Sequence, residues 1–329
     1  MTNGKNKHGK EIIFTAIPLS KIKPDVPLPT AVFLKINDKH IKFKEKDDCV
    51  TFDKFDTFIA KNVQYLYVDQ EEAPEFIKWI AKIKKKKIDD TIAALGSQNR
   101  KSIEQVEEIK EKIYDTFLSE KLSPEMVGLL KENVSDFIAN ISKDVTAIDF
   151  LKLLRSENPS IADHSVNVAN LSVYLAMVLG NGHQFVLENV YLGALFHDYA
   201  KAKIPVDILE NTNSHIYSQA INDHPIKGAS QIRKLFSAVP EQVFTIVEQH
   251  HEQFNGKGFP RGLAGLQIYE LTKIVSVANI FDNQVSLNSK RTGDQSMYKL
   301  AIKFLEYDRG KHFDPKIMPK ILNSLRLSF

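Results

Sequence analysis

The sequence predicts a mainly α-helical protein, with an all-helical domain at the C-terminus and a smaller mixed α/β domain before it. From Ala147 onward, apolar residues recur at spacings of three and four, which is typical of helices. Residues 11 to about 70 instead hold short β-type runs, EIIFTAIPL, TAVFLKI and VQYLYV, separated by clusters of Lys, Asp and Pro. The length of 329 residues favours two domains over one.

Composition narrows the classes of function. The 44 basic and 41 acidic residues give a formal charge of +3, too small to support nucleic-acid binding over the whole surface. The single cysteine, Cys49, excludes an intrachain disulfide and a thiolate metal site, and it favours a cytoplasmic location. The polar start does not resemble a signal peptide, and no apolar run approaches the roughly 20 residues of a membrane span. Any metal must therefore be bound by His, Asp, Glu or Asn.

We expect three segments along the chain: a small α/β domain at 1–88, a helical connector at 89–145 and the C-terminal domain at 146–329. In the first, PEFIKWIAKIKKKK predicts a helix, and we interpret its lysine run as a solvated helix end rather than a nucleic-acid patch. In the connector, apolar residues between Ile103 and Ile113 recur at helical spacing.

The C-terminal domain holds most of the ten histidines. In the segment HSVNVANLSVYLAMVLG, His164 lies on an apolar helical stripe, and Gly180 is expected to end the helix. A lone histidine on such a stripe is more often a satisfied core residue than a metal ligand. His164 alone therefore does not predict a metal site.

The next segment, VLENVYLGALFHDYAK, changes that balance. Asp198 shares the inward face of a predicted helix at its C-terminal end, where the helix dipole disfavours an anion. A buried carboxylate there needs a cation. The neighbouring His197 diverges from it by about 100° around the helix, which suits two metal ions with Asp198 between them. The alternative is a surface His-Asp pair, but the preceding Leu195 and Phe196 make a surface position less favourable.

Two further segments extend the cluster. In DHPIKGASQIRKL, His224 stands directly before Pro225 at the predicted start of another helix, which is a weak signal alone. In EQVFTIVEQHHEQFNGKGFP, an apolar helix ends in His250 and His251 and a glycine-rich turn follows, which packing alone does not explain. These five histidines and Asp198 form one candidate cluster. Imidazole and carboxylate ligands without sulfur suit iron, manganese or zinc, and paired ions about 3.5 to 4 Å apart are common in phosphoester hydrolysis.

The segments HDYAK, HPIKG, HHEQFNGKGFPRGL and ELTKIVSVANIFDNQVS together resemble the HD-GYP branch of the HD-domain phosphohydrolases. The resemblance covers about residues 146 to 300. It implies an all-helical domain that binds two or three iron or manganese ions and hydrolyses the bacterial second messenger cyclic di-GMP to the linear dinucleotide or GMP. Carried over by position, the metal ligands are His164, His197, Asp198, His224, His250 and His251, with Asp198 bridging.

The same resemblance assigns roles to residues around the metals. Lys201 matches a lysine near the bridging hydroxide and the scissile phosphate, where a cation stabilises developing charge. Asn279 stands at the position of the last metal-ligand Asp and is expected to be a seventh metal ligand through its carbonyl oxygen. Asp282 is expected to accept a proton from, or hydrogen bond to, the metal-bound water. Lys273, in place of a family Arg, and Arg261 are expected to hold phosphates.

The departures from the family pattern leave two functions open. Ser160 replaces the glutamate ligand of trinuclear members, which favours two ions over three. Phe259 replaces the Tyr of Gly-Tyr-Pro, keeping an aromatic face for the substrate but losing the hydroxyl. One reading is a dinuclear phosphodiesterase; the alternative, favoured by Phe259, Asn279 and Lys273, is a catalytically degenerate metal-bound receptor for a cyclic dinucleotide, or a protein-interaction module. The α/β domain is expected to be an input or interaction domain for a signalling protein partner, or a dimerisation unit.

Overall fold

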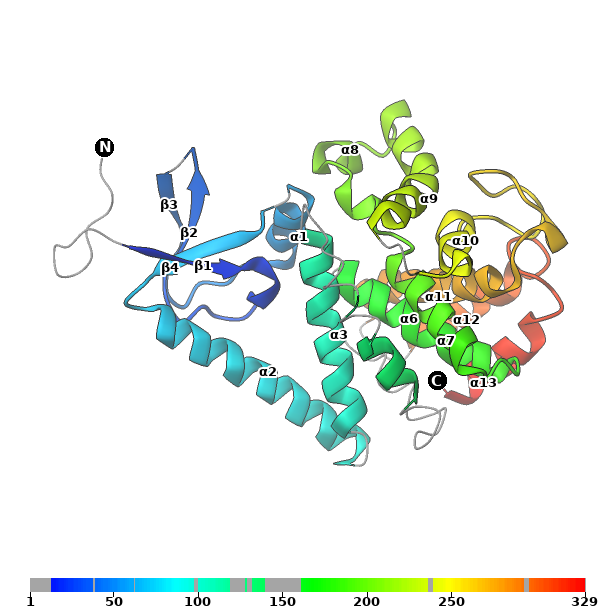
Figure 1. Ribbon diagram of the computed structural model, residues 1–329, viewed down its shortest axis with the longest axis horizontal. Helices are drawn as coiled ribbons and strands as arrows, with labels where there is room; N and C mark the ends of the chain where they lie inside the picture. The colour runs from blue at the N-terminus through cyan, green and yellow to red at the C-terminus, as the bar shows by residue number, and fades with distance from the viewer. Residues whose placement is uncertain are drawn as a thin grey trace. The chain divides into compact units, whose positions relative to one another are not determined.

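The computed structural model describes residues 13–37, 39–61, 63–97, 100–118, 128, 132–139, 161–235, 239–292 and 296–328. The chain divides into two compact units: the first runs to Ala94 and also includes Leu118, and the second holds Leu95–Phe117 and the rest of the chain (Figure 1). The fold is mainly α-helical, with one small sheet near the N-terminus, as the sequence predicts. Among the described helices, none is long and apolar enough to cross a membrane.

The first unit is built on a four-stranded antiparallel sheet with strand order β1-β4-β2-β3 (Figure 1). Its strands are β1 Phe14–Pro18, β2 Val32–Ile36, β3 Lys39–Lys44 and β4 Tyr65–Asp69, and its helices are η1 Leu19–Lys21, α1 Phe52–Ala60 and α2 Ala73–Leu95. Because strand side chains alternate between faces, one face buries Val32, Leu66 and Val68 completely. Phe55 and Phe76, from the two longer helices, are buried as well.

Two features of this unit differ from the expectations. Strand β3, KHIKFK, is an unpredicted edge strand, and lysines on edge strands hide the apolar alternation while they protect the edge from pairing with other chains. Helix α2 runs on to Leu95, so the prediction that the lysine run ends the helix was wrong. Lysine is a good helix former, and isoleucines continue the helical pattern as far as the buried Ile92.

The regular elements among the described residues of the second unit are helices. They include α3 Arg100–Leu118, α6 Ile161–Val178, α7 Gln184–Phe196, η3 Lys201–Lys203, α8 Val206–Glu210, α9 His215–Leu235, α10 Glu241–Gln249, η4 Gly265–Gln267, α11 Glu270–Thr292, α12 Ser296–Tyr307 and α13 Met318–Ser328. Helix α6 packs against both α7 and α11, and α10 packs against both α7 and α9. Helix α3, which we expected in a separate connector, belongs to this unit.

Glycines set two features of this packing. Gly180 adopts φ +96° and its N–H donates to the carbonyl of Met177 at 2.9 Å, so it ends α6 as predicted. At Gly193 of α7, a Cβ atom would lie 2.7 Å from the side chain of Ile246 on α10. The absent side chain therefore lets α7 and α10 approach closely, which brings their C-terminal ends together.

Candidate metal centre

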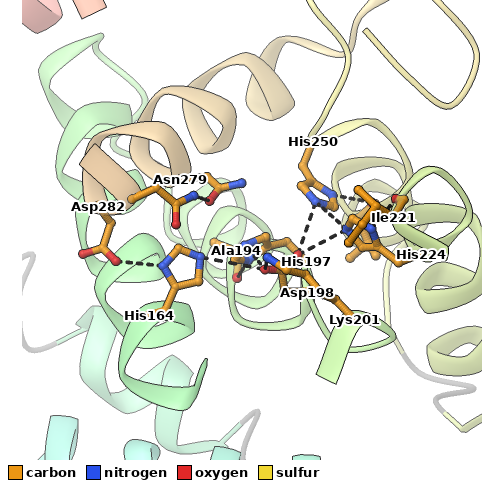
Figure 2. A network of polar contacts seen from close by, with 12 residues as sticks. His164, Ala194, His197, Asp198, Lys201, Ile221, His224, His250, Asn279 and Asp282 are labelled. Atoms are coloured by element: carbon orange, nitrogen blue, oxygen red, sulfur yellow. Dashed lines mark hydrogen bonds and ion pairs between the residues drawn. The ribbon is translucent and has the colours of Figure 1, made fainter. Parts of the chain in front are cut away.

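The predicted cluster assembles at the ends and middles of four helices (Figure 2). His164 comes from α6, His197 and Asp198 follow the last residue of α7, His224 lies on α9, and His250 and His251 follow α10. Two overlapping groups result: Asp198 with His224, His250 and His251, and Asp198 with His164 and His197. Asp198 is 1% exposed and belongs to both.

The two carboxylate oxygens of Asp198 face different histidines. Oδ1 lies 3.2 Å from Nε2 of His224 and 3.7 Å from Nε2 of His250. Oδ2 lies 3.6 Å from Nε2 of His197 and 3.9 Å from Nε2 of His164. A carboxylate with one oxygen toward each group has the arrangement that a bridging ligand between two ions requires.

Three of the imidazoles are fixed by backbone carbonyls. The Nδ1 atoms of His197, His224 and His250 lie 2.6, 2.6 and 2.8 Å from the carbonyl oxygens of Ala194, Ile221 and Val247. A carbonyl can only accept, so each Nδ1 carries the hydrogen and each Nε2 of a neutral ring is left as a bare lone pair. Bonds of this kind fix the tautomer and orientation of metal-binding histidines.

The converging lone pairs require a cation. The Nε2 atoms of His224 and His250 lie 3.2 Å apart, and when both rings are neutral and donate from Nδ1, neither Nε2 has a hydrogen to donate to the other. Nearby, Oδ1 of Asp198 is buried without a hydrogen-bond partner, and the same is true of Nε2 in His164 and His197. Buried acceptors facing one another are unfavourable unless a cation lies between them. The donor set of imidazoles and a carboxylate fits divalent transition-metal ions at this place.

Charges in the metal-free site follow from burial and from one lysine. Burial holds the pKa of His197 and His251 well below the ordinary value and lowers that of His250, so these rings are neutral. Burial also opposes ionisation of Asp198, but the Lys201 ammonium keeps the pKa of that carboxyl well below its usual range. Asp198 in turn raises the pKa of Lys201, whose Nζ lies 2.7 Å from Oδ2, so the lysine remains a cation.

His164 is held differently from the other histidines. Its Nδ1 lies 2.7 Å from Oδ2 of Asp282 on α11, 118 residues along the chain (Figure 2). Its Nε2 faces Asp198 on the other side of the ring. Asp282, which we expected next to a metal-bound water, therefore lies behind His164 and orients it.

Asn279, the expected seventh ligand, lies one helical turn before Asn283. Its side chain is buried, and its Oδ1 accepts a hydrogen bond of 2.8 Å from Nδ2 of Asn283. The amide oxygen thus has a protein partner. Ser160, on which the expectation of two ions rather than three rests, lies outside the described residues.

The Gly-Phe-Pro loop packs directly on the site. The ring of Phe259 stacks on the ring of His251 with centroids 4.5 Å apart. Gly258 has no space for a side chain, because a Cβ would lie 2.3 Å from the backbone nitrogen of Gln253. Glu252, which the sequence did not reveal, is 2% exposed and accepts N–H bonds from Arg261 and Leu263 at 2.8 and 2.9 Å. Its position directly after two predicted ligands was the only signal available for it.

The two residues expected to hold phosphates have protein partners. Lys273 and Asp314 form an ion pair of 3.0 Å between Nζ and Oδ2, with both side chains 7% exposed. This corrects the expected environment of Lys273, because its ammonium is held inside the domain by a carboxylate rather than presented to a ligand. Arg261 is half-exposed and pairs with Glu248 at 2.7 Å.

Comparison with known proteins agrees with the geometry. A family model described as an HD domain matches residues 150–317. A cyclic di-GMP phosphodiesterase of Pseudomonas aeruginosa is 28% identical over 186 residues, which cover 56% of this chain and 44% of that protein. A 3′3′-cGAMP-specific phosphodiesterase of Vibrio cholerae is 31% identical over 120 residues, covering 36% of this chain and 27% of that one. The chain thus spans less than half the length of these curated relatives.

A solved structure shares the fold across nearly the whole chain. A protein of Bdellovibrio bacteriovorus, described as HDG"Y"P, superposes with a TM-score of 0.64 at 24% identity, covering 95% of this chain and 100% of its own. Because the family model spans just over half of the residues and the histidine-aspartate cluster lies within it, the chain belongs to the HD domain family, and its motifs resemble the HD-GYP branch with Phe259 in place of the tyrosine.

Proposed function

We propose that this chain is a metal-dependent phosphodiesterase that hydrolyses cyclic di-GMP to the linear dinucleotide or GMP. In this proposal two divalent ions, iron or manganese, are held by His164, His197, Asp198, His224, His250 and His251. The observation that carries it is Asp198, whose two oxygens face two separate groups of bare imidazole nitrogens. The names of the relatives, which are cyclic di-GMP and cGAMP phosphodiesterases, support a cyclic dinucleotide as the substrate.

The residues of the chain have distinct tasks in this reaction. When bound, the two ions would lower the pKa of a water and offset the charge on the phosphate. Hydrolysis joins the water oxygen to phosphorus and breaks one P–O ester bond, and the departing ribose oxygen takes a proton. Lys201 remains protonated beside Asp198, and its side chain is 35% exposed, so its ammonium is available to the phosphate oxygens. Phe259 offers an aromatic edge beside His251 to a guanine ring.

A second candidate rests on the partners of the remaining residues. The ammonium of Lys273 is held by Asp314, and the amide oxygen of Asn279 accepts a hydrogen bond from Asn283. A site that lacks these two contributions, as well as a tyrosine hydroxyl, fits a metal-bound receptor that holds a cyclic dinucleotide without turning it over. The two candidates differ only in turnover.

The test is hydrolysis of cyclic di-GMP by the manganese- or iron-loaded full chain under anaerobic conditions. Asp198→Ala removes the proposed bridging ligand and serves as the control for contaminating activity. Asp207→Asn, at an exposed position on α8, is a matched control that leaves the cluster intact. We expect turnover in the native chain and in Asp207→Asn, and none in Asp198→Ala.

Other outcomes separate the candidates. Tight binding of cyclic di-GMP by the metal-loaded chain, without hydrolysis, would favour the receptor and refute the enzyme. Failure to bind two equivalents of Mn²⁺ or Fe²⁺ would refute both candidates, because each relies on the two histidine groups around Asp198.

A further inference from the structure

The carbonyls that fix the three imidazoles are normally occupied in a helix. In an α-helix the carbonyl of each residue accepts the N–H of the residue four positions later. Each of these histidines instead donates from Nδ1 to the carbonyl three positions before it. The backbone N–H that would compete for that carbonyl belongs to the residue directly after the histidine. The imidazole is therefore the favoured hydrogen-bond donor to this carbonyl wherever that backbone N–H is absent or directed elsewhere.

At two positions the helix simply ends. His197 is the residue that caps the C-terminus of α7, and His250 caps α10. The last four carbonyls of a helix have no partner within it, and those of Ala194 and Val247 are among them. These two rings thus occupy carbonyls that the helix leaves open.

His224 lies in the middle of a helix, where no end is available. Helix α9 runs from His215 to Leu235, and the residue after His224 is the buried Pro225. Proline has no backbone N–H, and its ring crowds the carbonyl four positions earlier, which here is that of Ile221. That same carbonyl accepts the hydrogen of His224 Nδ1 at 2.6 Å.

We propose that Pro225 is a positioning residue for His224: it frees the Ile221 carbonyl inside a continuous helix so that the imidazole presents a bare Nε2 to the cluster. Any other residue at position 225 would bring an N–H that competes for this oxygen. His224 would then be less firmly held in the Nδ1–H tautomer, and its Nε2 would be a poorer metal ligand. The consequence for metal binding rests on the proposed function, but the hydrogen bond itself belongs to the metal-free chain.

Two substitutions restore the N–H and differ in volume. Pro225→Ala leaves a small void, whereas Pro225→Val keeps nearly the size of the ring. Pro319→Ala is the matched control, because Pro319 is exposed and lies in the first turn of α13, a helix that carries none of the residues of the cluster. All are made in the full chain.

Two measurements read the outcome. The first is the ¹⁵N chemical shifts of the histidine rings in metal-free protein, with His224 assigned through the loss of its signals in His224→Gln. We expect Nδ1–H in the native chain and in Pro319→Ala, and a mixture of tautomers in both Pro225 variants. The second is calorimetric titration with Mn²⁺ alone, where we expect the Kd to rise about tenfold or more in both variants, as is typical when the partner of a ligating histidine is lost.

The possible results separate a failure of this proposal from a failure of the proposed function. Unchanged ring shifts and unchanged Mn²⁺ affinity in Pro225→Ala and Pro225→Val would overturn the proposal. A loss of affinity in Pro225→Ala that Pro225→Val restores would also overturn it, because packing and not the N–H would then be the cause. If the native chain bound no Mn²⁺, the proposed function would fail, while the ring shifts would still decide whether Pro225 sets the tautomer.

Discussion

The ammonium of Lys110 on α3 lies 3.3 Å from the carboxylate of Asp163, the residue directly before His164. Both side chains are almost completely buried, and Glu107 lies 3.6 Å from the same ammonium. Burial disfavours the charged lysine, but Asp163 and Glu107 outweigh it and raise its pKa. Helix α3 is thereby fixed to α6 at the position that carries a candidate metal ligand.

Replacing Lys110 by Met should strongly destabilise the second unit. The substitution removes the ammonium that faces the buried Asp163 carboxylate, and breaking a buried ion pair in this way costs about 3–5 kcal/mol. Urea unfolding of the metal-free protein measures the loss. Lys112→Met, which removes a more exposed pair with Glu108, is the control and should cost under about 1 kcal/mol. Equal losses in the free energy of unfolding would show that the buried pair contributes no more to stability than the exposed pair.

Replacing Asp282 by Asn should weaken metal binding without unfolding the protein. The amide can still accept from Nδ1 of His164, but it lacks the charge that makes the ring a stronger ligand. Loss of such a partner typically lowers metal affinity about 10- to 100-fold. Calorimetric titration with Mn²⁺ tests this, beside thermal unfolding of the metal-free variant. A lowered turnover with unchanged Mn²⁺ affinity would instead favour the proton-acceptor role.

Replacing Gly258 by Ala should displace the Gly-Phe-Pro loop. The new Cβ would fall 2.3 Å from the nitrogen of Gln253 and 2.5 Å from the carbonyl oxygen of His251, both backbone atoms that cannot rotate away. The ring of Phe259 would then leave its stacked position on His251. We expect turnover of cyclic di-GMP to fall at least about tenfold, since misplacement by 1 Å can cost on the order of 100-fold.

Gly182→Ala is the control for this substitution, because a Cβ at Gly182 meets nothing within 4 Å. It should leave turnover unchanged. Native-like turnover in Gly258→Ala would mean that the loop tolerates displacement and that the stacking contact has no part in the reaction.

Lowering the pH should destabilise the metal-free protein already at pH values above those at which ordinary carboxyl groups titrate. The pKa values of His197, His250 and His251 are lowered in the folded state, while an unfolded histidine has a pKa of about 6.5. Below that value the unfolded chain binds protons that the folded chain does not, so the free energy of unfolding decreases as the pH falls. The contribution of Asp198 begins to decrease as the pH falls through the ordinary carboxyl pKa of the unfolded chain, and it is lost completely only below the lowered folded pKa.

Urea unfolding at several pH values between about 7 and 5 measures this slope. His183→Gln, at an exposed position, should keep the same slope. A flat profile in the metal-free native chain would contradict neutral, buried imidazoles in the cluster.

The candidate centre was predictable because its residues stand out locally. His164, Asp198 and the His250-His251 pair each occupy inward positions on apolar helices, where polar side chains need a partner. The contacts between distant segments were not predictable. Lys273 meets Asp314 across 41 positions, and no periodic pattern connects them.

His224 shows how a sound local rule fails. Proline usually marks the start of a helix, so His224-Pro225 was placed at a helix entry. The structure has a helix that begins at His215 and continues through the proline. The lost backbone bond is offset by the bond between the imidazole and Ile221, which only the three-dimensional arrangement reveals.

The distribution of the ligands over four helices has a consequence for biosynthesis. A chain leaving the ribosome acquires His164, His197 and Asp198 first, whereas His250 and His251 follow only after α9 and α10 have been made. His164 and the His197-Asp198 pair are therefore made before the elements that orient them, because Asp282 lies on α11 behind His164 and α10 packs against α7. The proposed centre would then be ready for metal only after α11 has been translated, so metal loading would follow the completion of the domain.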